Sequence, residues 1–121
     1  MRRLLLAALL LTLIGCSKAP PTMAGGKWAR TLRDPDASLR KKAAFHLGNI
    51  GRSDPEVLPA LIEGMNDPDA KVRCEVILAL SKYGPGAEEA IPALSKLRDA
   101  DSDATVRDYA LKALAKLQGK G

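Results

Sequence analysis

The chain has few of the side chains from which most active sites are built. Its 121 residues include one histidine, two cysteines, one Phe, two Tyr and one Trp. A metal site at His46 would need further His, Cys or clustered carboxylate ligands, and none stands at coordinating spacing. A Ser/His/Asp set cannot be argued with one histidine, and no glycine-rich phosphate loop is present. We therefore expect no enzyme activity, no metal and no cofactor, and a partly buried, structural His46.

Long apolar runs are also scarce. The one long run covers residues 4–14 and follows the basic pair Arg2 and Arg3. A bilayer span needs about 20 helical residues, so this run is too short to cross a membrane. Its length and its basic flank are typical of a signal peptide. The sequence therefore predicts export, the alternative being an uncleaved apolar N-terminus.

The end of this run carries a resemblance. The sequence LIGC at positions 13–16 is similar to the lipobox of bacterial lipoproteins. In that family a diacylglycerol is linked to the Cys, the peptide is cut just before it, and the new N-terminus is acylated, for example with palmitate. The resemblance implies a signal peptide over residues 1–15, lipid attachment at Cys16 and a periplasm-facing position in the bacterial cell envelope. An Asp after the lipobox Cys favours retention in the inner membrane, and because Ser17 stands there the outer membrane is favoured. The alternative to a lipoprotein is a plain secreted protein.

Charge and cysteine content agree with an exported chain. Two arginines are the only charges in residues 1–15, so their removal lowers the net charge from +5 to +3. This mild charge does not indicate a nucleic-acid partner. With Cys16 lipidated, Cys74 is the other cysteine, and no intramolecular disulfide can form. A nucleophilic thiol needs a neighbouring base, and His46 is in another part of the sequence, so we expect an inert, partly covered Cys74.

A short linker precedes the rest of the chain. Residues 17–26 contain two Pro, two Gly and no helical pattern. As a flexible coil they would span about 17 Å. Together with Cys16 they are predicted to form a tether over residues 16–26, which holds the folded part close to the lipid surface.

The remainder of the chain repeats itself. The segment DPDASLR at 34–40 recurs as DPDAKVR at 67–73 and, more loosely, as DSDATVR at 101–107. The shifts are 33 and 34 residues. A fixed period in this range is typical of stacked supersecondary units.

Each unit reads as two helices and no strand. Apolar residues at helical spacing follow each of the three motifs, and an Asp precedes each of these second helices as a candidate cap. The first helices are predicted over about 55–65 and 87–98, whereas unit one keeps only a stub at 27–33. The last helix, 103–117, is expected to act as a capping helix with a polar outer side.

The pattern D-P-D-x-x-V-R-x-x-A-x-x-A-L followed by Gly is similar to HEAT repeats, most of all to the short type named after phycobilisome lyases. The resemblance covers residues 27–118. It implies an all-α fold, a short right-handed α-solenoid of about three helical hairpins with the first truncated, in a domain over 27–121. Iron-binding His-Glu pairs of some family members are absent. In this family Asp and Arg side chains form a ladder between units, a role that the resemblance assigns to Asp34, Arg40, Asp67, Arg73, Asp101 and Arg107.

The side of the second helices that points away from the core is the candidate binding surface. On a helical wheel centred on Ala43, both Lys41 and Phe45 point away from the core, and Leu78 is the equivalent of Phe45. An apolar patch with basic edges would suit a partner helix or peptide. The alternative is that Phe45 and Leu78 complete the packing between units. The candidate partner-binding residues are Lys41, Phe45, Leu78, Lys82 and Lys112.

These observations favour an interaction protein. We expect a lipid-anchored, monomeric scaffold or adaptor that binds a protein partner, with the membrane contacted only through its acyl chains. The alternative is an accessory or chaperone-like relative of the phycobilisome lyases that acts on a chromophore or a modified protein. Nucleic-acid binding, a third option, is disfavoured by the export signal.

Overall fold

The structure is a computed structural model that describes residues 23–119. These residues form α-helices joined by short turns, with no strand among them. None of the described helices is both long and apolar enough to cross a bilayer. The α-helices are α2 (Met23–Thr31), α3 (Ala37–Ile50), α4 (Val57–Gly64), α5 (Ala70–Tyr83), α6 (Ile91–Ala100) and α7 (Ala104–Leu117), with 3-10 turns at Gly51–Ser53 and Glu88–Ala90.

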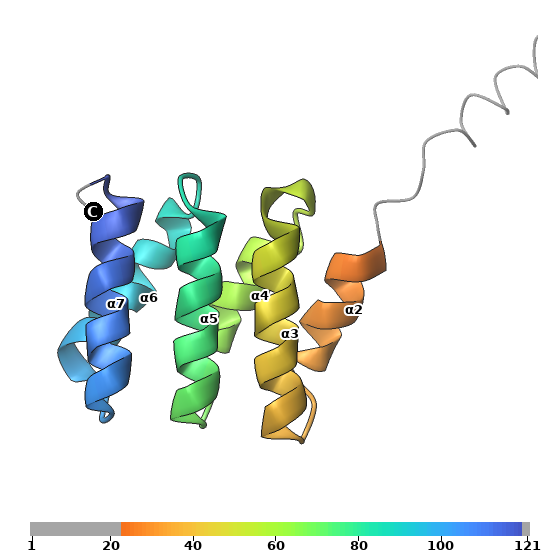
Figure 1. Ribbon diagram of the computed structural model, residues 1–121, viewed down its shortest axis with the longest axis horizontal. Helices are drawn as coiled ribbons and strands as arrows, with labels where there is room; N and C mark the ends of the chain where they lie inside the picture. Colours follow the sequence, from red (N-terminus) through yellow and green to blue (C-terminus); the bar gives the residue numbers. More distant parts are fainter. Residues whose placement is uncertain (1–22, 120–121) are drawn as a thin grey trace, which may run out of the picture.

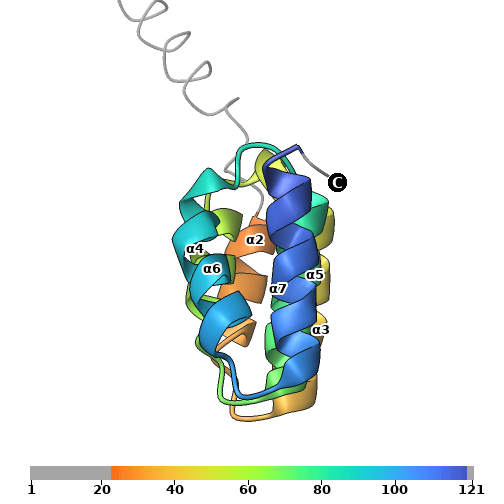
Figure 2. The ribbon, with the colours of Figure 1, turned by 90° about the vertical axis from the view of Figure 1, so that its left-hand side faces the viewer.

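The helices form two layers. The three longer helices, α3, α5 and α7, stand side by side (Figure 1). The shorter helices, α2, α4 and α6, form the second layer behind them (Figure 2). From α2 to α7 the chain advances with a right-handed turn, one hairpin after another (Figures 1 and 2). The expected all-α solenoid of three hairpins is confirmed.

The long helices begin and end where the repeated motif predicts. Asp36, Asp69 and Asp103 each cap a long helix, and the side chain of each accepts a hydrogen bond from a backbone N–H two residues further on, at 2.7–2.8 Å. Two of the helices end at Gly51 and Gly84, whose φ values of 59° and 73° favour glycine. Local chemistry therefore determines the bounds of this layer.

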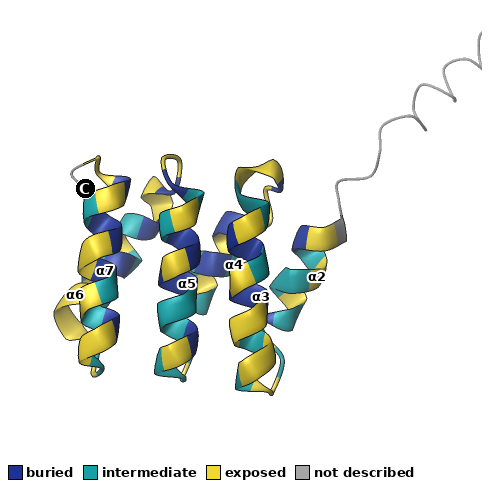
Figure 3. Cartoon of the chain, in the orientation of Figure 1, coloured by how far each residue is buried: buried dark blue, intermediate teal, exposed yellow. Residues whose placement is uncertain are grey.

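The core lies between the two layers. Fully buried leucines come from both, for example Leu47 and Leu80 from the long helices and Leu61 and Leu94 from the short ones. In Figure 3 buried segments recur on each of the long helices, where they alternate with exposed ones. Each hairpin therefore buries its apolar side against its neighbours, as expected for stacked repeats.

The start of the array differs from the prediction. Helix α2 begins at Met23, so the last four residues of the tether predicted at 16–26 are helical. The stub predicted at 27–33 is too short, since α2 has nine residues and α4 has eight. Gly25 is buried, and a Cβ there would lie 2.5 Å from Asp54 Cγ. The glycines that resemble a linker in the sequence instead allow α2 to approach the start of unit two.

The last helix is less polar than expected of a cap. Asp108, Lys112 and Lys116 are exposed on α7, but Leu111 on the same helix is 54% exposed. Its equivalent one unit earlier is Ile77, which is buried. The difference arises because a following unit covers Ile77, whereas no described unit follows α7.

Candidate functional site

At the junction between units one and two, the arginine of the first motif binds the aspartate of the second. Arg40 donates from Nε to Asp67 Oδ2 at 2.7 Å and from Nη2 to Asp67 Oδ1 at 3.2 Å. Its third nitrogen, Nη1, donates to the backbone carbonyl of Asp34 at 2.9 Å. The carboxylate contact therefore crosses to the next unit, and only a backbone contact joins the two members within one motif.

The second junction repeats this geometry. Arg73 binds Asp101 through Nε and Nη2, at 2.8 and 3.0 Å, and donates from Nη1 to the carbonyl of Asp67 at 2.7 Å. Burial by itself would raise the pKa of Asp101, but the Arg73 hydrogen bond, the Asp103 N–H and the Arg73 charge together lower it below the ordinary value. Such forked ion pairs are strong and geometrically specific. The carboxylates of Asp67 and Asp101 are therefore both occupied by an arginine of the preceding unit.

The candidate binding surface is the side of α3, α5 and α7 that faces away from α2, α4 and α6, which we call the long-helix face. Two large apolar side chains stand on it, Phe45 at 51% and Leu78 at 48% exposure. They occupy equivalent positions in α3 and α5, separated by the repeat period. About half of each side chain is therefore accessible, and the other half is covered by the array.

Leu78 borders a hollow of about 340 Å³ in this face. Lys41 reaches it from α3, Lys71 and Cys74 from α5, and Tyr109 from α7. Burial, followed by the nearby charge of Asp103, raises the pKa of the Cys74 thiol. The hollow is therefore mixed in character: Leu78 and Ala70 line it with apolar surface, Lys41 and Lys71 are basic, and Glu75 and Asp103 are acidic.

Phe45 lies in a second group, next to α2. Its ring is nearly perpendicular to that of His46, with centroids 5.6 Å apart, and His46 in turn stacks on Trp28 with ring centroids 4.1 Å apart. Lys82 extends from α5 to α3, where its Nζ is 5.6 Å from the centre of the Phe45 ring and bonds to Asn49 Oδ1. His46 therefore packs between the ring of Trp28 on α2 and that of Phe45 on α3. This packing agrees with the structural role expected from the sequence.

Lys112 is not part of either group. Its Nζ pairs with Asp108 Oδ2 on the same helix at 2.8 Å. The hydrogen bond that Lys112 donates to Asp108, together with the charge of that carboxylate, raises the pKa of Lys112. In the structure Lys41 therefore lies near Leu78 and Lys82 lies near Phe45, whereas Lys112 is paired with Asp108.

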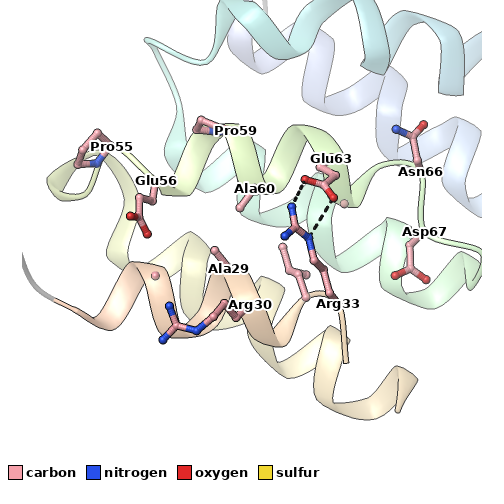
Figure 4. Close-up of a pocket in the computed structure, with 13 residues that line it drawn as sticks. Ala29, Arg30, Arg33, Pro55, Glu56, Pro59, Ala60, Glu63, Asn66 and Asp67 are labelled. Carbon is pink, nitrogen blue, oxygen red and sulfur yellow. Dashed lines mark hydrogen bonds and ion pairs between the residues drawn. The ribbon is translucent and has the colours of Figure 1, made fainter. Parts of the chain in front are cut away.

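A further groove, which was not predicted from the sequence, lies between α2 and α4 in the opposite layer. Its volume is about 620 Å³, and small residues such as Ala29 and Ala60 keep it open (Figure 4). An exposed forked pair crosses it, in which Arg33 Nη2 lies 2.9 Å from Glu63 Oε2. Small residues at helical spacing were the available signal, but only the packing of α2 on α4 places them face to face.

Two further expectations concern lipid attachment and metal binding. The predicted lipid-attachment residue, Cys16, lies outside the described residues. Across residues 23–119 no group of three His, Cys, Asp or Glu side chains is arranged to hold a metal ion.

Comparison with known proteins agrees with the repeat geometry. A family model described as HEAT repeats matches residues 27–115, most of the chain. No curated protein matches the sequence.

Proposed function

Since the chain belongs to the HEAT-repeat family, we propose that it is an adaptor that binds a partner protein through the long-helix face and is anchored in the cell envelope by a lipid on Cys16. HEAT repeats commonly mediate protein–protein interaction. We propose no catalytic role, because the carboxylates of Asp67 and Asp101 are engaged in ion pairs and the Cys74 thiol has a raised pKa.

The observation that carries this proposal is the pair of exposed apolar side chains. Phe45 and Leu78 lie one repeat apart on adjacent helices, while other apolar residues of these helices, such as Leu47 and Leu80, are fully buried. About half of each side chain stays in water, which leaves apolar surface at both positions for a partner to cover. Burial of that remaining surface in a complex would be favourable, at about 25 cal/mol per Å².

The charge around the pair defines the kind of partner. Lys41 and Lys71 border the hollow beside Leu78 together with Glu75 and with Asp103, whose carboxylate caps α7, and Lys82 lies over Phe45. Lysines are therefore more numerous than acidic side chains around the pair. We therefore propose a partner helix or extended segment with two apolar anchors about one repeat apart and carboxylates beside them. The lysines would act mainly on the rate and specificity of association.

A double substitution tests the binding surface. We expect Phe45→Ser with Leu78→Ser to abolish crosslinking of the partner in intact cells, followed by mass-spectrometric identification. The matched control is Leu111→Ser, which removes an equally exposed apolar side chain from outside the hollow and should keep the partner. Retention of the partner together with loss of the cooperative melt in the double variant would mean that both residues serve the fold.

The lipid anchor has its own test. Mass spectrometry of the native protein should find an N-terminal peptide that begins at Cys16 and carries acyl chains. Two or more chains would keep the protein stably on the membrane, and we propose that they face it toward the periplasm, with the outer membrane favoured. An unprocessed, unacylated N-terminus would refute the anchoring and leave the binding surface to be tested by itself.

The chromophore-related alternative is less well supported. The groove between α2 and α4 is lined by small, proline and charged residues and by Leu32, with no aromatic side chain among them. A pigment site would be expected to offer apolar or aromatic walls. Visible absorbance that copurifies with the protein would favour this alternative over the adaptor.

A further inference from the structure

The two ends of the array carry the two halves of its internal junction. At both junctions the Arg of one unit binds the Asp of the next, as Arg40 binds Asp67 and Arg73 binds Asp101. The first Asp of this series is Asp34, and no described unit precedes it. The last Arg of the series is Arg107, and no described unit follows it.

Arg107 is already held in the geometry of a junction arginine. Its Nη1 donates to the backbone carbonyl of Asp101 at 2.6 Å, as Arg40 does to Asp34 and Arg73 does to Asp67. In the two internal arginines, Nε and Nη2 form the edge that binds a carboxylate. Within residues 23–119 this edge of Arg107 meets no carboxylate. The Nε and Nη2 edge of Arg107 is therefore already oriented to bind a carboxylate, and the side chain does not need to reorganise.

Asp34 is prepared in the same way. Its Oδ1 accepts the backbone N–H of Asp36 at 2.9 Å, and Asp67 accepts that of Asp69 at the same distance. In the junctions this bond fixes the carboxylate, which then receives the arginine. No basic side chain of the described part pairs with Asp34, so its carboxylate is a fixed acceptor at the free end.

Apolar side chains accompany both charges. Leu111 is 54% exposed, and it stands where the preceding units have the buried Ala44 and Ile77. Leu39 is 39% exposed, and its equivalent Val72 is buried. Each end therefore presents one apolar side chain and one oriented charge, and the two charges have opposite sign.

We propose that the chain associates head to tail with a second copy of itself, with Arg107 of one copy bound to Asp34 of the next and with Leu111 and Leu39 covered at the contact. Charge complementarity of the two ends is the basis of this choice. Such a contact is heterologous and can extend into a row of copies. It is independent of the partner that the long-helix face binds.

The contact differs from an internal junction in one respect, which determines its strength. Inside the array, Gly48 of α3 approaches Ala79 of α5 so closely that a Cβ on Gly48 would lie 3.0 Å from the Ala79 backbone. At the free end His46, which is stacked on Trp28, stands at the position equivalent to Ala79. The larger side chain keeps the long helices of two copies further apart. The association is therefore weak and reversible, and the chain is a monomer when dilute.

Charge reversal tests this arrangement in the full chain, kept in detergent and followed by sedimentation velocity over a wide range of protein concentration. We expect the wild type to show concentration-dependent growth. Arg107→Asp and Asp34→Arg should each weaken it by about tenfold or more, since like charges then face each other. The double variant, and an equimolar mixture of the two single variants, should recover association because opposite charges meet again. Milder Arg107→Gln and Asp34→Asn variants, with thermal melts of all proteins, separate association from folding.

Three results would overturn the proposal. A wild type that stays monomeric at every concentration removes it. Loss of association with Arg107→Asp but not with Asp34→Arg would indicate a symmetric tail-to-tail dimer instead. Failure of the double variant to recover, in a protein that melts like the wild type, would show that the two charges do not meet. Leu111→Ser should weaken association while leaving partner binding through the long-helix face intact, so the two proposals fail separately.

Discussion

Substitution of the two neighbouring glycines in α2 tests the revised start of the folded domain. Both were predicted to belong to a linker, where Gly→Ala would have little effect on stability. In the structure Gly25 is buried, and a Cβ there would lie 2.5 Å from Asp54 Cγ and closer still to Oδ2. At Gly26 the nearest atom would be Glu56 Oε2 at 2.7 Å, the tip of an exposed side chain that can move away. The two positions should therefore respond in opposite directions.

The magnitudes follow from helix propensity and overlap. Ala in place of Gly stabilises a helix by about 1 kcal/mol. At Gly25 the overlap involves Asp54, which is buried and whose Oδ1 accepts the Glu56 N–H at 2.9 Å, so it cannot turn away freely. Overpacking of this kind costs about 1–3 kcal/mol. We expect Gly25→Ala to lower the free energy of unfolding by up to about 2 kcal/mol net, whereas Gly26→Ala leaves it unchanged or raises it by up to about 1 kcal/mol.

Thermal melts followed by far-UV circular dichroism measure both effects. For a domain of this size 1 kcal/mol shifts Tm by about 4–8 °C. The double variant Gly25→Ala with Asp54→Ala provides the decisive control, because removal of the carboxylate removes the overlap. In the Asp54→Ala background, Gly25→Ala should become neutral or stabilising. A stabilising Gly25→Ala in the otherwise unchanged chain would refute the packing of α2 on Asp54 and restore a domain boundary near residue 27.

Three further outcomes are expected. Ile77→Ala should reduce the free energy of unfolding by about 2–4 kcal/mol in urea denaturation, because Ile77 is fully buried, whereas Leu111→Ala should change it by less than about 1 kcal/mol; equal effects would contradict the different burial of these equivalent positions. Because the folded pKa of Asp101 lies below its ordinary value of 3.8, its contribution to stability should be complete above that pH and lost as the pH falls through the lower folded pKa. Tm measured against pH should show this loss, and Asp101→Asn should remove it. Cys74, with its pKa raised by burial, should react with iodoacetamide more slowly than a free thiol at pH 8 and at the free-thiol rate in urea; equal rates under native conditions would contradict its burial.

The long helices were predictable because their signals are local. Asp36, Asp69 and Asp103 cap helices through hydrogen bonds to residues two positions away, and apolar residues recur at helical spacing after each of them. A period near 33 residues then implies stacking, since a single hairpin cannot bury its apolar side. None of these inferences required a distance between units.

The partner of each ladder residue was less predictable. The motif places Asp34 and Arg40 six residues apart, and this spacing alone does not say which carboxylate each arginine of the ladder binds. In the structure the carboxylate of Asp67 takes the arginine fork, whereas Asp34 contributes its backbone carbonyl. The direction of the pair depends on how one hairpin stacks on the next, and sequence spacing does not contain it.

By itself, the amino-acid sequence determined the helical class, the number of units and the places where the long helices begin and end, because caps, periodicity and repeats act over a few neighbouring residues. Only the tertiary structure decided that Gly25 belongs to a helix, that Phe45 and Leu78 stay half exposed, and that Leu111 is uncovered while its equivalent Ile77 is not. Each of these depends on which surface another unit covers. Equivalent positions in a repeat have the same local sequence environment but not the same neighbours, and burial is a property of the neighbours.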